Sequence, residues 1–168
     1  MRATLSSAQV QCKGCKELQT LARNDPDKRV HIVAEGGILV VIAAMTVHWR
    51  HEDVQKHGCC ALWNLSINNN NNLIAIAADG CIPVLLAAMK VHLGHAVVQE
   101  HGCGTMVNLS RNNDHNKIAI AADGGIPVHP SAASNDEGAH GTCKGAEARL
   151  RRAVETLLQR QQQDSDCG

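Results

Sequence analysis

Aromatic residues are almost absent from this chain. Its 168 residues include two Trp, no Tyr and no Phe. Ala, Val, Ile and Leu therefore supply the apolar mass of the core, and side chains of this size suit helices that approach one another closely. The hydrophobic fraction of 44% is ordinary for a globular protein, and the length predicts one domain with a real core.

The chain also lacks net charge, because 16 Lys and Arg residues balance 16 Asp and Glu residues when His is neutral. No field over the whole molecule would hold nucleic acid or an anionic membrane, so we expect neither as a partner. No apolar run approaches the ~20 residues of a spanning helix, and the start MRATLSSAQVQ lacks the apolar region of a secretory signal. We expect a cytoplasmic protein, with the nucleus as the second compartment.

The sequence does contain an internal repeat. HGCCALWNLSINNNNN begins at His57, and HGCGTMVNLSRNNDHN begins 44 residues later at His101. Residues 52–84 and 96–128 are identical at 21 of 33 positions under this shift. The same offset relates HIVAEGGI to AIAADGCI, AAMTVH to AAMKVH, and VQCKGCKELQTLA to VQKHGCCALWNLS. A period of this size predicts a stack of repeats.

Each repeat unit divides into three predicted helices. NNNNNLIAIAAD is a short first helix that Gly80 ends, and CIPVLLAAMKVH is a second helix with Pro83 in its first turn. The third helix spans about residues 53–65 in one copy and 97–109 in the next. Its core face carries five residues at helical spacing, namely Val54, Gly58, Ala61, Leu62 and Leu65. Glycine inside a helix predicts the close approach of a neighbouring backbone at Gly58 and at its counterpart Gly102.

Eight cysteines would fit a disulfide framework in a small secreted protein, but the repeat explains three of them better. Cys15, Cys59 and Cys103 are each 44 residues apart, as expected of a small buried side chain at one recurring core position. Cys12 and Cys15 form a CxxC pair, but a tetrahedral zinc site needs a second pair, and none exists. We therefore predict reduced thiols, no bound metal and no cofactor.

The histidines also recur with the repeat. His48 and His51 return as His92 and His95, and His57 returns as His101. Two His three residues apart have the spacing of metal ligands or of a pH sensor, but duplication of whole units accounts for the recurrence without either. The chain has no phosphate-binding loop, GxSxG elbow or HExxH motif, and we predict that it is not an enzyme.

The chain resembles the armadillo repeat over about residues 8–128. The resemblance lies in the succession of a predicted helix, the motif NKIAIAADGGIP, a second helix and the motif VQxxGCxxxxNL. The resemblance implies an all-α, right-handed α-solenoid of about three repeats whose third helices line a concave groove. It also implies that an Asn near the end of each third helix helps to hold an extended peptide, and the matching residues are Asn64 and Asn108. Where importin-like members have a Trp four residues before that Asn, this chain has Lys16, Cys60 and Gly104, so the resemblance does not extend to nuclear localisation signals.

We predict a non-enzymatic module that binds a peptide or protein segment along this groove. The predicted groove residues lie opposite the core face of the third helices: Lys56, Cys60, Trp63, Asn64, Glu100 and Asn108. Asparagine offers both a donor and an acceptor to an extended backbone, and tryptophan supplies apolar anchor area. Two alternatives from other classes are a structural solenoid that self-associates through its exposed ends and a His- or Cys-based metal-binding protein.

The remaining segments complete the predicted domain plan. Residues 1–7 are a disordered N-terminus, 8–128 the repeat domain, 129–145 a loop and 164–168 a tail. Residues 146–163 form an amphipathic helix with Leu150, Val154, Leu157 and Leu158 at helical spacing. We predict that this helix caps the apolar face that the last repeat leaves exposed.

Overall fold

The computed structural model describes residues 7–111 and 113–122, and within these ranges the chain is helical without any strand. The described helices are α2 (Ala8–Arg23), α3 (Pro26–Ala34), α4 (Gly37–Val47), α5 (Glu52–Ser66), α6 (Asn70–Ala78), α7 (Cys81–Val91), α8 (Ala96–Ser110) and α9 (Asp114–Ala122). The predicted all-α repeat fold is confirmed. The two predicted third helices each extend one residue further at both ends than the sequence pattern indicated.

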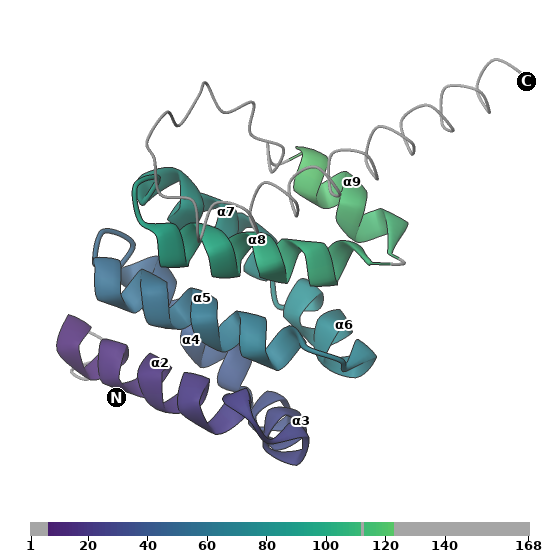
Figure 1. The fold of residues 1–168 in the computed structure, drawn as a ribbon, viewed down its shortest axis with the longest axis horizontal. Helices are drawn as coiled ribbons and strands as arrows, with labels where there is room; N and C mark the ends of the chain where they lie inside the picture. Colours follow the sequence, from purple (N-terminus) through teal and green to yellow (C-terminus); the bar gives the residue numbers. More distant parts are fainter. Residues whose placement is uncertain (1–6, 112, 123–168) are drawn as a thin grey trace, which may run out of the picture.

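The helices repeat with the 44-residue period of the sequence, so that α3, α4 and α5 correspond to α6, α7 and α8. Helix α2 is a third helix, and α9 is a first helix. Figure 1 shows the third helices α2, α5 and α8 side by side in one layer, with α4 and α7 behind them and α3, α6 and α9 along one end. The third helices therefore form a continuous face of the molecule.

Local chemistry sets where the first and second helices begin and end. The side chain of Asp25 accepts hydrogen bonds from the backbone N–H groups of Asp27 and Lys28 at the start of α3. The side chain of Asn69 caps α6 in the same way, by accepting from the backbone N–H of Asn72. Gly36 and Gly80 have φ of 77° and 79°, a left-handed conformation that favours glycine, and the chain bends there by 72° and 76°.

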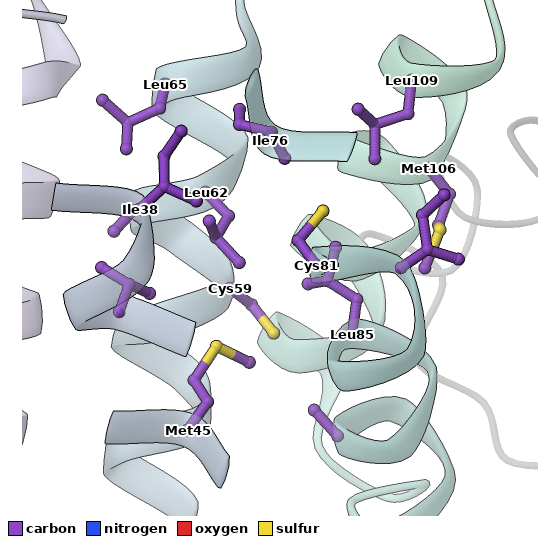
Figure 2. Close-up of a cluster of buried hydrophobic side chains, with 14 of the residues drawn as sticks. Ile38, Met45, Cys59, Leu62, Leu65, Ile76, Cys81, Leu85, Met106 and Leu109 are labelled. Carbon is purple, nitrogen blue, oxygen red and sulfur yellow. The ribbon is translucent and has the colours of Figure 1, made fainter. Parts of the chain in front are cut away.

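The core is a single cluster of aliphatic and sulfur-containing side chains contributed by every described helix. Figure 2 shows side chains of α4 and α5 facing those of α7 and α8 across it. Cys15, Cys59 and Cys103 are buried at their recurring position, as predicted, and the cysteines of the described residues form no disulfide. Burial raises the pKa of Cys15 to about 11, so this thiol stays neutral at physiological pH.

The predicted close backbone approach at Gly58 and Gly102 is wrong, because side chains occupy the space instead. A Cβ atom on Gly58 would lie 2.5 Å from Cγ of Met45, and one on Gly102 would lie 2.6 Å from Sδ of Met89. Each methionine comes from the second helix of the same unit. The absence of a side chain at each glycine therefore leaves space for a methionine, a side chain flexible enough to fill an irregular gap.

Glutamine side chains attach each second helix to the third helix that follows it. Nε2 of Gln55 donates to the carbonyl oxygens of Met45 and His48, at 2.8 and 3.0 Å. Gln99 repeats this pair with Met89 and His92, at 2.8 and 3.1 Å. Each glutamine thus provides a donor for the methionine carbonyl in the last turn of the second helix and a further donor for the histidine carbonyl that follows, which also accepts from a backbone N–H.

Among the described helices, none is by itself long and apolar enough to cross a membrane. The only candidates by length and composition are the two bent pairs, α3 with α4 and α6 with α7. The predicted loop 129–145, the amphipathic helix 146–163 and the tail 164–168 lie outside the described residues, as do residues 1–6. The domain boundaries stay predictions.

Candidate partner-binding surface

All six predicted groove residues lie on the neighbouring third helices α5 and α8, but they are not equally accessible. Lys56, Trp63, Glu100 and Asn108 are half-buried and reach the surface. Cys60 and Asn64 are each only 4% exposed and lie beneath that surface. We call the exposed parts of α2, α5 and α8 that face away from α4 and α7 the third-helix surface.

The two predicted peptide-binding asparagines already hold neighbouring third helices together. Nδ2 of Asn64 donates to the carbonyl oxygen of Gln19 on α2 at 3.0 Å. Nδ2 of Asn108 donates to Oγ of Ser66 on α5 at 2.9 Å. A carboxamide has two N–H donors and one carbonyl acceptor, so each side chain keeps part of its capacity. Asn108 is the more accessible of the two, and its amide is better placed to meet a ligand.

The indole of Trp63, on α5, packs against α8. A Cβ atom on Gly104 would lie 2.7 Å from Nε1 of Trp63, so only glycine leaves room for this indole. The imidazole of His101 meets the ring edge-on, with centroids 4.9 Å apart and an interplanar angle of 82°. These contacts hold the half-buried indole rigidly, and a rigid aromatic ring loses little conformational entropy when a partner binds it.

The charges on the third-helix surface change sign from one unit to the next. Burial, and then the positive charges of Lys56 and Lys16, lower the pKa of His57, which places both lysines beside this imidazole. Burial raises the pKa of Cys60 to about 11, while the charge of Lys56 acts to lower it and that of Glu100 to raise it, so both charged groups lie near this thiol. The third-helix surface therefore carries Lys16 on α2 and Lys56 on α5 beside His57, and Glu100 on α8 near Cys60.

His57 is expected to make stability depend on pH. Its folded-state pKa lies below the ordinary 6.5, so the unfolded chain binds the proton more readily. The neutral imidazole stabilises the folded state, in part through a 2.8 Å hydrogen bond between its Nδ1 and Oε1 of Gln19. This contribution to the free energy of unfolding is complete above about pH 6.5 and declines as the pH falls below that value. In thermal unfolding, the melting temperature of the wild type should exceed that of His57→Gln by less at about pH 5.5 than at about pH 7.5. A difference in melting temperature that does not change with pH would contradict this.

The recurring histidines of the turns link neighbouring units. Nε2 of His92 lies 3.0 Å from the carbonyl oxygen of Trp49, and Nε2 of His95 lies 3.1 Å from Oε1 of Glu52. Among the residues that the structure describes, no group of three or more His, Cys, Asp or Glu side chains is placed to hold a metal ion. His92 and His95 therefore pair with oxygen atoms of the preceding unit.

Two further features of the surface are not predicted by the sequence patterns. The turns before α5 and α8 present Trp49, 47% exposed, and its repeat counterpart Leu93, 57% exposed. The guanidinium of Arg50 stacks 4.3 Å above the Trp49 ring. The second feature is a cleft of about 570 Å³ where the ends of α5 and α8 meet the starts of α6 and α9. The asparagines that line this cleft are visible in the sequence, but their helical spacing does not indicate that they meet around a cleft.

Comparison with known proteins identifies a family to which most of the chain is similar. The family model described as the LRRK2 ARM repeat matches residues 1–124, about three quarters of the chain. Neither the curated proteins nor the solved structures contain a match.

Proposed function

The chain belongs to the LRRK2 ARM repeat family, and from this membership we propose that it binds an extended segment of a partner protein along its third-helix surface. Repeats of this kind are protein-interaction modules and are typically not enzymes. Stacked repeats present a long surface, and an extended segment with unpaired backbone groups fits such a surface. The cytoplasmic location expected from the sequence stays a prediction.

One observation carries the proposal: anchor residues reach the surface at neighbouring positions on parallel helices. Trp63 offers apolar area in a fixed orientation, which is the usual chemistry of an interface hot spot. Asn108 retains amide capacity for a peptide backbone beside it. The buried Asn64 supports this surface from below by holding α5 against α2.

The charges define the ligand further. Lys56 and Glu100 occupy equivalent positions 44 residues apart, one on α5 and one on α8. Packed helices lie about 8–10 Å apart, which an extended chain covers in about three residues at ~3.3 Å each. We therefore propose a ligand with an acidic residue over Lys56 and a basic residue about three positions away over Glu100.

Reversing these charges should change which peptides bind. We expect peptides selected from a displayed library against the wild type to carry opposite charges about three positions apart. Lys56→Glu should weaken binding of such a peptide about 10-fold in isothermal titration calorimetry, because an attraction becomes a repulsion at a half-buried position. The exchange variant Lys56→Glu/Glu100→Lys should select the opposite order of charges.

Lys90→Glu supplies the matched control, because it makes the same charge change on α7, outside the third-helix surface. It should alter the affinity less than about 2-fold. Equal losses for Lys56→Glu and Lys90→Glu would reveal an effect of net charge alone. If Lys56→Glu binds the selected peptide as tightly as the wild type, the third-helix surface is not the binding site.

A further inference from the structure

The two junctions between repeat units are built differently, although their sequences correspond. A junction is the place where a third helix ends, the next first helix begins, and both meet the end of the following third helix. At the first junction the side chain of Arg29 fills the space. Its Nε donates to the carbonyl oxygen of Ala22 at 2.7 Å, Nη2 to that of Arg23 at 3.1 Å, and Nη1 to that of Ile67 at 3.3 Å.

At the second junction the residue equivalent to Arg29 is Leu73, which has no hydrogen-bond donor in its side chain. The cleft of about 570 Å³ opens there, with Leu73 in its wall. The cleft is also lined by Ser66, Asn68, Asn70, Arg111 and Asn113. None of the described residues that line it is acidic. The guanidinium of Arg29 fills the space at the first junction, and the corresponding space at the second junction stays open.

Two of the three acceptors recur around this cleft. Ser66 corresponds to Ala22, and both are helical. Arg111 corresponds to Ile67, and both are helix C-caps of nearly the same conformation, with φ −65° and ψ 118° against φ −74° and ψ 123°. The third acceptor does not recur, because α2 continues through Arg23 whereas α5 ends one residue earlier.

We propose that this cleft binds the guanidinium group of an arginine side chain carried by the partner segment. The inference rests on the proposed function and names one residue of its ligand. A guanidinium has five N–H donors in a planar fork, and carbonyl oxygens of Ser66 and Arg111 repeat two of the partners that Arg29 uses. The carboxamide oxygens of Asn68 and Asn70 add acceptors.

The side chain of Arg111 opposes this ligand, because it places a like charge at the rim of the cleft. The first junction has Ile67 at the corresponding position. Replacing Arg111 by Ile should therefore tighten the binding of a guanidinium several-fold. A site built for an anion would respond in the opposite direction, since it would lose its cation.

Nuclear magnetic resonance titration of the full chain with N-acetyl-L-arginine amide tests the proposal. We expect the side-chain amide signals of Asn68 and Asn70 to shift in the wild type and in the control Leu73→Met. Leu73→Arg should abolish the shifts, because its own guanidinium then fills the cleft as Arg29 does. The citrulline analogue has the same length but is neutral with a carbonyl in place of one amino group, and it should bind at least about 10-fold more weakly.

Three outcomes would overturn the proposal: equal shifts with the citrulline analogue, preferential binding of N-acetyl-L-alaninate, or no shift with the arginine probe in either the wild type or Arg111→Ile. These outcomes do not depend on how Leu73→Arg folds. The probe is too small to reach Lys56 and Glu100, so their charge exchange should leave its titration unchanged. A failed peptide selection and a failed titration can therefore be told apart.

Discussion

Gln55→Leu is expected to lower the free energy of unfolding by about 2–4 kcal/mol. Gln55 is 1% exposed, and its Nε2 donates to two carbonyl groups at the end of α4. Leucine is similar in volume, so the cavity is small, but both carbonyls lose a donor in a place with little water. Urea unfolding followed by far-ultraviolet circular dichroism gives the value directly.

Gln9→Leu is the matched control, because Gln9 is exposed on α2 and the chemical change is the same. It should change the free energy of unfolding by less than about 0.5 kcal/mol. Gln99→Leu, at the repeat counterpart of Gln55, should be destabilising as well, since its amide makes the equivalent pair of bonds. Equal stability of Gln55→Leu and Gln9→Leu would show that the buried amide does not stabilise the fold.

Alanine should have opposite effects at two equivalent glycines. Gly58→Ala is expected to lower the free energy of unfolding by about 1–2 kcal/mol, because its Cβ would lie 2.5 Å from Cγ of Met45, a buried side chain. This overpacking exceeds the ~1 kcal/mol that alanine contributes through helix propensity. Gly14→Ala, at the same repeat position of α2, meets no atom within 4 Å and should raise the free energy of unfolding by up to about 1 kcal/mol.

The cause of the Gly58 effect can be isolated with Met45→Ala. In that background the space opposite Gly58 is empty, so the added methyl group should cost nothing or stabilise the protein. The double-mutant cycle should then show a favourable coupling of about 1–3 kcal/mol between the two positions. Additive effects, or a loss of stability in Gly14→Ala, would show that methionine packing is not what selects glycine here.

The amino-acid sequence by itself determined the repeat, the helices and the face that each third helix buries. Val54, Ala61, Leu62 and Leu65 were predicted to share a core face, and all four are buried. Cys15, Cys59 and Cys103 occupy one recurring buried position, as their spacing indicated. These features are readable because helical periodicity is local, and because duplication shows the same local pattern twice.

The accessibility of the candidate site could be predicted only in part. Sequence spacing correctly assigned Lys56, Trp63, Glu100 and Asn108 to the outer side of α5 and α8, where they reach the surface. It gave no sign that Asn64 is 4% exposed and bonded to Gln19, which lies 45 residues earlier in the chain. Helical spacing identifies the side of a helix but not how far the neighbouring helix covers that side.

Only the tertiary structure decided which side chain fills each space between the units. It places Met45 opposite Gly58, the indole of Trp63 over Gly104, and the guanidinium of Arg29 in a junction that stays open at Leu73. The guanidinium of Arg29 donates to the carbonyl oxygen of Ala22 on α2 and to that of Ile67, the C-cap of α5, which lies 38 residues away in the chain. Such contacts depend on the packing distance between two helices. The side chains of both helices together determine this distance, so the sequence of either helix alone does not.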